Sequence, residues 1–384
     1  MKLYEYEAKK LFEEAGIPIP QGALAASPEE VRSIAERLGG PVVLKPQTLS
    51  KQRGKAGLIG FADSPPEAEE FSRSLFSRKH EDEPIEHILV EEKVALKGEL
   101  FVGLAVDYKE SRPVLLLSPQ GGVEIETLAK EQPGLVKKWP ITVSRGLSEK
   151  DALSLAEYIR QERPGAPADR VTELQRLLLS FYTLFKKMDC ELAEINPLGI
   201  REDFSLIALD GAMVMDDEAQ FRHTELVRPR AQSEEAFKRD QGFKNKGWTY
   251  IQMEGDIGIL SSGAGITMAI LDLIHLKGGK AANFLDTAQM NRQGIFEAFQ
   301  IFHNSPHLKC LLINIFAGLN RCDDLAEGIK DYLSAYQPPF PIVVRMVGNR
   351  EKEGREVLNS IGIQPIASLE ESVDGAISAA EAWK

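Results

Sequence analysis

The chain has 384 residues, which at roughly 150 residues per domain suggests two or three domains, each long enough to bury a core. Hydrophobic residues make up 43% and charged residues 27%, close to globular averages, so the composition excludes a disordered or fibrous chain. The formal net charge of -12 argues against binding to nucleic acid or to an anionic membrane surface, because both would repel the protein.

Two further features bear on where the protein works. The first residues, Met1 to Glu7, have no apolar run behind their charges, and no segment reaches the ~20 apolar residues that span a bilayer. We therefore expect a cytoplasmic protein, or an organelle protein read without its transit peptide. The cysteines, Cys190, Cys310 and Cys322, are odd in number and lack C-x-x-C spacing, which predicts core thiols rather than disulfides or a zinc site.

The first half of the chain mixes helices and strands. Helical spacing predicts a helix over 5–15. Ser27, followed by Pro28 and Glu30, predicts a capped helix that ends at Gly39-Gly40. The remaining predicted elements are strands at 41–45, 58–61, 88–91, 100–107 and 114–117, helices at about 149–161 and 171–188, and a hairpin of 191–200 and 204–215. The polar stretch 216–250 is interpreted as a connector.

From residue 257 onward the pattern changes to regular alternation of strands and helices. The predicted strands are 257–260, 281–285, 309–316, 341–346 and 363–367, and the predicted helices are 266–276, 292–302, 323–335, 351–361 and 370–383. Five such units predict a parallel, doubly wound sheet that binds ligands at the carboxyl ends of its strands. We place the domain boundary at residue 238, giving domains 1–238 and 239–384.

Several charged residues lie where strands end. Lys45 ends an apolar strand and precedes the basic loop Arg53-Gly54-Lys55-Ala56-Gly57. Such a loop can close over phosphates, but a solvated basic hairpin has the same spacing, and the spacing favours neither. Glu91 ends one strand and Glu99 opens the next, where carboxylates can accept hydrogen bonds from a nucleotide; ordinary surface acids remain the simpler interpretation.

The predicted hairpin offers a more specific pattern. If its turn centres on Asp203, then Asn196 and Asp210 lie opposite each other, because both are seven residues from that centre. Glu194 lies two residues before Asn196 and faces the same side. Carboxylate and amide oxygens are ligands that Mg²⁺ prefers, although a polar, solvated hairpin face would show the same spacing.

Together, these residues resemble the succinate-CoA ligase β-subunit family over nearly the whole chain. The matching motifs are Leu3-Tyr4-Glu5-Tyr6-Glu7-Ala8-Lys9, Arg53-Gly54-Lys55-Ala56-Gly57, Gly121-Gly122-Val123-Glu124-Ile125-Glu126, Glu194-Ile195-Asn196-Pro197-Leu198, Leu209-Asp210-Gly211, Gly263-Ala264-Gly265, Ala282-Asn283-Phe284-Leu285-Asp286 and Asn314-Ile315-Phe316. The resemblance implies an α/β protein: a two-lobed α+β ATP-grasp domain, with its smaller lobe at about 20–100, followed by a flavodoxin-like, doubly wound CoA-ligase domain.

The resemblance also implies roles for individual residues. ATP would be held by Lys45, the backbone around Gln52, Arg53 and Gly54, Glu91, the backbone at Val94, and Glu99. Asn196 and Asp210 would hold Mg²⁺, and Glu194 would face a phosphorylated histidine. In this family that histidine belongs to the partner α subunit, which agrees with the absence here of a histidine in a suitable glycine-rich context.

The sequence departs from the family pattern in the nucleotide loop and at the positions expected to bind the acid substrate, so the identity of the acid stays open. Leu49 and Lys51-Gln52 replace the family's histidine and glycine pair, so this loop looks like that of ATP-citrate lyase and citryl-CoA synthetase. Thr287-Ala288-Gln289-Met290 replaces a glycine-rich run. At the substrate positions, Ser262 replaces an asparagine, and Gly318, Leu319 and Asn320 belong to a loop that is usually of the Gly-Gly-Ile-Val type.

The resemblance implies an ADP-forming acid–CoA ligase with ATP and CoA as co-substrates. In such an enzyme ATP phosphorylates the partner histidine, the phosphohistidine phosphorylates a carboxylate, and the CoA thiol displaces the phosphate. Three interpretations remain open: a succinate–CoA ligase, a ligase for citrate or another carboxylic acid, and a nucleotide-binding regulatory subunit without acyl transfer.

Overall fold

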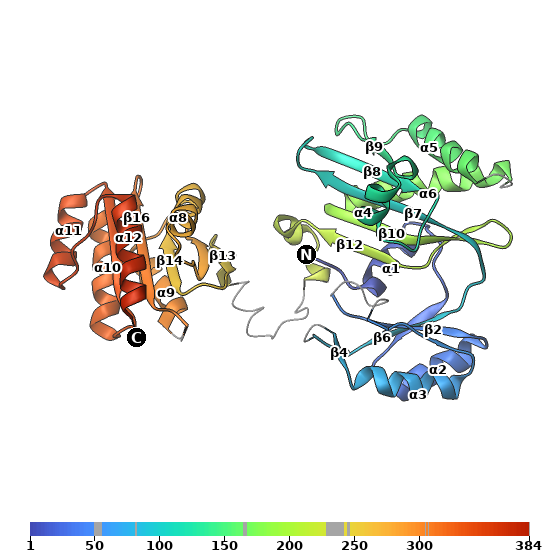
Figure 1. Ribbon diagram of the computed structural model, residues 1–384, viewed down its shortest axis with the longest axis horizontal. Helices are drawn as coiled ribbons and strands as arrows, with labels where there is room; N and C mark the ends of the chain where they lie inside the picture. The colour runs from blue at the N-terminus through green and yellow to red at the C-terminus, as the bar shows by residue number, and fades with distance from the viewer. Residues whose placement is uncertain are drawn as a thin grey trace. The chain divides into compact units, whose positions relative to one another are not determined.

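The computed structural model describes residues 1–49, 56–80, 83–163, 167–227, 242–243, 246–303, 305 and 307–383. Its contacts divide the chain into two units, Met1–Ala231 and Gln232–Lys384 (Figure 1). Residue 238, where the sequence leads us to place the domain boundary, lies outside the described residues. No helix among the described residues is long and apolar enough to cross a membrane.

The first unit contains a small antiparallel sheet near its N-terminus. The strands, in the spatial order β1-β6-β2-β3, are β1 (Gly22–Ala25), β6 (Ile88–Glu92), β2 (Val42–Pro46) and β3 (Gly60–Ala62). Helices α2 (Pro28–Leu38) and α3 (Pro65–Phe76) pack on this sheet and bury one apolar cluster with it (Figure 1). A short ribbon of β4 (Lys79–His80) and β5 (Glu83–Pro84) lies between α3 and β6 in the chain.

The start of α2 confirms the capping prediction. The Ser27 hydroxyl accepts a hydrogen bond from the Glu30 backbone N–H at 3.2 Å, and Pro28 occupies the first turn, where its missing N–H costs nothing. The Glu30 carboxylate accepts from the backbone N–H of Ala26 rather than from that of Ser27. Gly39 ends the helix in the left-handed conformation that glycine adopts without strain, with φ +69°.

A larger sheet forms the rest of the first unit. The main strands, in the order β11-β10-β7-β8-β9, are β11 (Leu206–Ala208), β10 (Cys190–Arg201), β7 (Leu96–Asp107), β8 (Arg112–Ser118) and β9 (Lys137–Pro140), and β12 (Gly211–Met215) also pairs with β10. The helical segments of this part are α1 (Glu5–Glu14), α4 (Ile125–Glu131), α5 (Glu149–Glu162), α6 (Ala168–Lys187), η1 (Pro133–Leu135), η2 (Asp217–Arg222) and η3 (Thr224–Leu226). Phe12 of α1 meets Phe181 of α6 edge-on, with ring centroids 5.8 Å apart, inside one shared core.

The hairpin prediction is correct in register but wrong in continuity. Leu198 pairs with Ala208 and Ile195 with Gly211, as a centre at Asp203 requires. The predicted strand 204–215 is divided into β11 and β12 opposite Pro197, which accepts from the Leu209 N–H at 3.1 Å but has no N–H to donate to the Leu209 carbonyl. That break exposes the Leu209 carbonyl to a side chain of the small sheet, as described below.

The second unit is a five-stranded sheet in the order β13-β15-β14-β16-β17. Its strands are β13 (Thr249–Gln252), β14 (Ile257–Ser261), β15 (Asn283–Asp286), β16 (Cys310–Ala317) and β17 (Ile342–Gly348), and its helices are α8 (Ala264–Leu276), α9 (Arg292–His303), α10 (Cys322–Ala335), α11 (Glu351–Ser360) and α12 (Leu369–Ala382). The four strands from β14 onward are parallel. Their order is that of a flavodoxin-like, doubly wound sheet.

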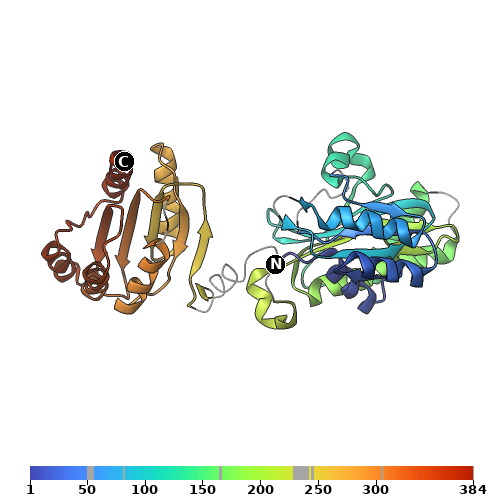
Figure 2. The same cartoon turned by 90° about the horizontal axis from the view of Figure 1, so that it is seen from below.

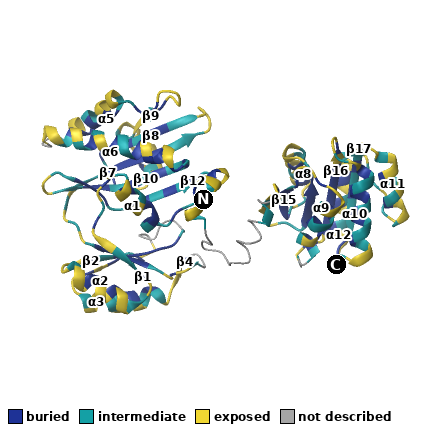
Figure 3. Ribbon diagram, turned by 180° about the vertical axis from the view of Figure 1, so that it is seen from behind, coloured by how far each residue is buried: buried dark blue, intermediate teal, exposed yellow. Residues whose placement is uncertain are grey.

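Separate apolar clusters cover the two faces of this sheet. One cluster involves α9 and α10, and the other involves α8 and α12 (Figure 2). The central strands are almost wholly buried between them, whereas the outer surfaces of the helices are exposed (Figure 3). Burial on both faces explains the continuous apolar runs of these strands.

Two strand predictions in this unit are corrected. The segment 363–367 forms a single bridge, from Arg345 to Ile366, rather than a strand: Ile366 donates to the Val344 carbonyl and accepts from the Met346 N–H. Strand β13 lies in the stretch interpreted as a connector and pairs antiparallel with β15. Because β13 lies at the edge of the sheet, even its apolar residue Ile251 is 55% exposed. Such a strand needs few apolar residues, so its sequence shows little apolar pattern.

Candidate functional site

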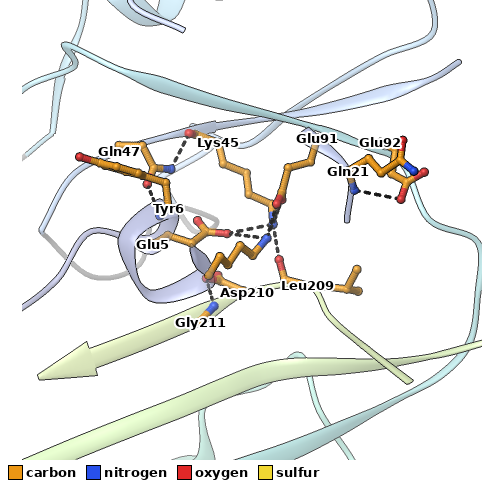
Figure 4. Close-up of polar contacts among 11 residues, drawn as sticks. Glu5, Tyr6, Gln21, Lys45, Gln47, Glu91, Glu92, Leu209, Asp210 and Gly211 are labelled. Atoms are coloured by element: carbon orange, nitrogen blue, oxygen red, sulfur yellow. Dashed lines mark hydrogen bonds and ion pairs between the residues drawn. The ribbon is translucent and has the colours of Figure 1, made fainter. Parts of the chain in front are cut away.

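A group of buried charges connects the small sheet of the first unit to helix α1. Lys45, at the end of β2, places its Nζ 3.0 Å from Glu5 Oε1 and 2.9 Å from Glu91 Oε2 (Figure 4). Lys9 Nζ lies 2.6 Å from both oxygens of Glu91 and 3.2 Å from Glu5 Oε1. We call Glu5, Lys9, Lys45 and Glu91 the four-charge cluster.

Helix α1 supplies half of this cluster because of its spacing. Glu5, Ala8, Lys9 and Phe12 recur at helical intervals and are all buried, so they share the inward face of the helix. Charged groups are tolerated there only when they are paired, since an isolated buried charge is strongly disfavoured. The partners come from β2 and β6, which brings residues distant in sequence to one place.

The cluster influences the protonation of its two lysines in opposite directions. Burial works against the charged form of Lys45, but the carboxylates of Glu5, Glu91 and Asp210 outweigh it and raise the pKa of that lysine. For Lys9, burial and the neighbouring charge of Lys45 lower the pKa, although the two glutamates of the cluster act against this shift. Lys45 is therefore firmly cationic.

Asp210 approaches the cluster from the break between β11 and β12. The Leu209 carbonyl accepts a hydrogen bond from Lys45 Nζ, and Asp210 Oδ1 accepts one from the Gly211 N–H at 2.7 Å (Figure 4). A Cβ on Gly211 would lie 2.2 Å from the ring of Phe12, so only glycine lets the turn approach α1 this closely.

Asn196 lies across the hairpin from Asp210, as the register predicts, and its backbone N–H donates to the Asp210 carbonyl at 3.2 Å. Its amide group holds a glycine loop: Oδ1 accepts from the Gly122 N–H at 2.8 Å, and Nδ2 donates to the Val123 carbonyl at 3.0 Å. Nδ2 also donates to Glu194 Oε1 at 3.0 Å, so Glu194 and Asn196 share one side of the strand.

The same glycine loop approaches Glu99. Gly122 has φ +72°, and a Cβ there would lie 2.3 Å from Glu99 Oε2. Glu99, Gly121 and Arg163 contribute to the lining of an open pocket of about 340 Å³, and Arg163 donates to the Glu99 carbonyl at 3.0 Å. Val94 is half-buried in the short link between β6 and β7.

The described structure places several of the site residues expected from the sequence near one another. The structure brings Lys45, Glu91 and Asp210 together, and it joins Glu99, Asn196 and Glu194 through the loop at Gly121-Gly122. The remaining expected residues, Gln52, Arg53 and Gly54, lie outside the described residues.

Sequence reasoning missed the contributions of Glu5 and Lys9. Their signal was present, because both occupy the same helical face as the buried Phe12, where a charge needs a partner. The glycine pair Gly121-Gly122 was noted as a motif but was given no role, because spacing alone does not show that it lies against Glu99 and Asn196.

In the second unit, the residues expected at the substrate positions follow neighbouring parallel strands. Ser262 comes directly after β14, and Gly318, Leu319 and Asn320 come directly after β16, at the point where the strand order reverses. Such a point is where ligands bind in doubly wound sheets. Leu319 is 82% exposed, and Asn320 is half-buried.

The loop after β14 has an unusual backbone. Gly263 has φ +100°, and its N–H donates to Asp286 Oδ1 at 2.7 Å. The Ser262 hydroxyl is buried and has no hydrogen-bond partner among the described residues. Beneath it, Asn314 links the strands by donating to Ser261 Oγ at 3.0 Å and accepting from Arg345 at 2.8 Å.

The comparisons with known proteins agree with both units. An ATP-grasp domain model matches residues 2–200, and a CoA-ligase model matches residues 260–378. The fold and the two family models thus define a two-domain ATP-grasp CoA ligase subunit. The β subunit of succinate–CoA ligase (ADP-forming) from Ignicoccus hospitalis is 37% identical over 383 residues, covering 100% of each chain. The protein of that name from Chloroflexus aurantiacus is 37% identical, covering 99% of each.

The chain belongs to the succinate–CoA ligase (ADP-forming) β-subunit family. A solved structure of ATP citrate lyase from Methanothrix soehngenii, in complex with citrate and coenzyme A, superimposes with a TM-score of 0.75. The match covers 98% of this chain and 99% of that one at 20% identity, which shows a shared fold. The chain is accordingly a subunit of an ADP-forming CoA ligase, for which ATP and CoA are substrates.

Proposed function

We propose that the protein is the β subunit of a succinate–CoA ligase and works with an α-type partner whose histidine carries the phosphate. One observation carries this proposal: three separate elements bring Lys45, Glu91 and Asp210 together, and Lys45 is held in its charged form. A fixed cation supplies part of the positioning and charge stabilisation that the transfer of a phosphoryl group from a nucleotide requires. The relatives named above support succinate as the acid.

In this proposal the first unit binds ATP. Lys45 contacts the phosphates with the backbone around Gln52, Arg53 and Gly54, and Glu91, Val94 and Glu99 contact the nucleoside. Glu194 faces the phosphohistidine of the partner. We assign residues 1–238 to the ATP-grasp domain, with its smaller lobe at about 20–100, and residues 239–384 to the CoA-ligase domain. Three buried thiols fit a cytoplasmic protein.

We propose Asn196 and Asp210 as the residues that hold Mg²⁺. The described residues contain no group of three or more His, Cys, Asp or Glu side chains suited to a metal. The two oxygen donors nevertheless fit this ion, because Mg²⁺ typically takes one or two protein ligands and completes its shell with waters and substrate phosphates. When bound, the ion would neutralise charge on the transferring phosphoryl group.

The second unit would receive the acid at Ser262, Gly318, Leu319 and Asn320. Helices α8 and α10 begin just beyond these loops, and the dipole at the start of a helix favours an anionic group. A carboxylate repels nucleophiles, so it must first become an acyl phosphate, whose phosphate the CoA thiol then displaces with cleavage of the C–O bond and release of phosphate. The departures at these loops make the identity of the acid the point to test.

Reconstitution with the α-type partner tests the proposal. With γ-labelled ATP, we expect the partner to be labelled and this chain to stay unlabelled, and succinate to be the best acid in a panel that includes citrate. Asp210→Ala should abolish labelling, whereas Asp203→Ala, in the exposed hairpin turn, should not. Asn320→Ala should retain labelling and subunit association but raise the KM for the acid. Stable, acid-labile phosphate on this chain, or labelling unaffected by Asp210→Ala, would refute the assigned roles.

The acid panel also separates the alternatives. Turnover with citrate and not with succinate would identify the complex as a citrate–CoA ligase. ATP binding without CoA ligation of any acid, in a complex that assembles normally, would favour a regulatory subunit.

A further inference from the structure

The four-charge cluster contains a second lysine to which the proposed ATP chemistry assigns no role. The side chain of Lys9 is 2% exposed, whereas that of Lys45 is 11% exposed at the end of its strand. Solvent and ligands therefore reach Lys45 more easily than Lys9. The buried lysine needs an explanation, because removing an ammonium group from water is costly unless it gains strong partners.

The two lysines compete for the same oxygen atoms. Glu5 Oε1 lies 3.2 Å from Lys9 Nζ and 3.0 Å from Lys45 Nζ. Glu91 Oε2 lies 2.6 Å from Lys9 Nζ and 2.9 Å from Lys45 Nζ. The positive charge of Lys9 also repels that of Lys45, so the net hold of the cluster on Lys45 is weaker than two buried carboxylates alone would exert.

A charge count shows what Lys9 contributes. The cluster has two lysines and two glutamates, so its formal charge is balanced when all four groups are ionised. If Lys45 turns toward a phosphate, Lys9 remains as the counter-ion of both buried glutamates. Without Lys9, Lys45 would be the sole cation of the cluster, and leaving Glu5 and Glu91 would strand two buried negative charges.

We propose that Lys9 is a positioning residue: by neutralising Glu5 and Glu91, it leaves the ammonium group of Lys45 available to the phosphates of ATP. This inference rests on the proposed role of Lys45 in ATP binding. It makes Lys9 necessary for phosphate affinity even though Lys9 itself contacts only protein. It also implies that Glu5 weakens ATP binding by attracting Lys45, so neutralising Glu5 should strengthen the binding of the ATP phosphates.

Binding of ATP and of adenosine to the full-length chain in the presence of Mg²⁺, measured by calorimetry, tests this inference. Lys9→Met should raise the Kd for ATP at least about tenfold, because an extra unbalanced buried carboxylate then holds Lys45. The Kd for adenosine, which has no phosphate, should change much less than the Kd for ATP, although Lys9 also pairs with Glu91, which we assign to the nucleoside. Lys10→Met, which changes the exposed lysine next in α1, is the matched control and should alter neither.

The variant Glu5→Gln provides a second, independent test of the inference. Alone it should lower the Kd for ATP by about threefold, and combined with Lys9→Met it should restore the affinity to near that of the unmodified chain. Equal weakening of ATP and adenosine binding by Lys9→Met, or a double variant no better than Lys9→Met, would overturn the inference. If Lys9→Met does not fold, weaker ATP binding by Glu5→Gln would overturn it on its own.

Lys45→Met separates this inference from the proposed function. If Lys45→Met leaves ATP affinity unchanged, the assignment of Lys45 to the phosphates fails, and the role of Lys9 fails with it. If Lys45→Met abolishes ATP binding while Lys9→Met has no effect, only the role of Lys9 is refuted.

Discussion

Asn283 holds two strands of the CoA-ligase unit together with its side chain. Strands β14 and β15 pair at Ser261 and Asp286, and a bridge joins Ile257 to Ala281. Between these points Asn283 Oδ1 accepts from the Ile259 N–H at 2.9 Å, and Nδ2 donates to the Ile259 carbonyl at 2.8 Å. The amide group therefore takes the place of a strand backbone where the two strands separate.

The effect of Asn283→Ala follows from this geometry. Asn283 is 1% exposed and Ile259 is fully buried, so the substitution leaves one N–H and one C=O without partners or water. At ~1–3 kcal/mol for each of these two unsatisfied buried groups, the loss is about 2–6 kcal/mol, and about 3 kcal/mol is a low value within that range. This corresponds to a decrease of roughly 10 °C in the melting temperature of a unit of this size.

Hydrogen exchange measures the local consequence. The amide of Ile259 should exchange roughly 150-fold faster in Asn283→Ala, since about 3 kcal/mol of protection is lost. Asn291→Ala is the matched control, because its Oδ1 accepts only an exposed hydrogen bond from the Gly294 N–H at 2.9 Å. We expect that control to cost about 1 kcal/mol, the usual value for loss of a helix cap.

A second substitution distinguishes hydrogen bonding from packing. Asn283→Asp preserves the shape and one acceptor but turns a buried carboxylate toward the Ile259 carbonyl, so it should be at least as destabilising as Asn283→Ala. If Asn283→Asp is much milder than Asn283→Ala, packing rather than hydrogen bonding dominates. A loss of about 1 kcal/mol lowers the melting temperature of such a unit by ~4 °C. If the melting temperatures of Asn283→Ala and Asn291→Ala differ by less than about 3 °C, and the Ile259 amide stays protected from exchange, the proposed role of the Asn283 amide is wrong.

Two further predictions concern the ATP-grasp unit and the thiols. Gly122→Ala should destabilise the protein by about 1–2 kcal/mol, because φ is +72°, and should weaken ATP binding, because the new Cβ would displace the Glu99 carboxylate. Gly134→Ala is the control and should have neither effect, because a Cβ at Gly134 meets open space. Equal melting temperatures of the two variants would contradict this prediction. Burial raises the pKa of the Cys190 and Cys310 thiols to about 12 and that of Cys322 to about 11. We therefore expect iodoacetamide at pH 8 to leave all three unmodified, as intact mass would show, until urea unfolds the chain; rapid native alkylation would refute their burial.

The sequence by itself determined the elements whose signals are local. Ser27, Pro28 and Gly39 defined the ends of α2, because capping uses atoms within four residues of the helix terminus. The symmetric spacing about Asp203 gave the register of the hairpin, since pairing in a hairpin depends only on where the turn lies. The alternation of strands and helices after residue 257 predicted the doubly wound sheet.

Sequence-level prediction failed where the outcome depended on neighbours. Strand β13 has a weak pattern and exists because β15 offers an edge, whereas the expected strand at 363–367 meets β17 through a bridge at Ile366. In each case the deciding contact joins segments that spacing along the chain does not relate.

The candidate site shows the same division. Resemblance to a family supplied Lys45, Glu91 and Asp210, but not the contacts that determine their charge. Lys45 meets Glu5 across 40 residues and the Leu209 carbonyl across 164 residues of sequence. Only the tertiary structure decided that Lys9 and Lys45 share two carboxylates, because the strength of a charge interaction depends on distance and burial in three dimensions.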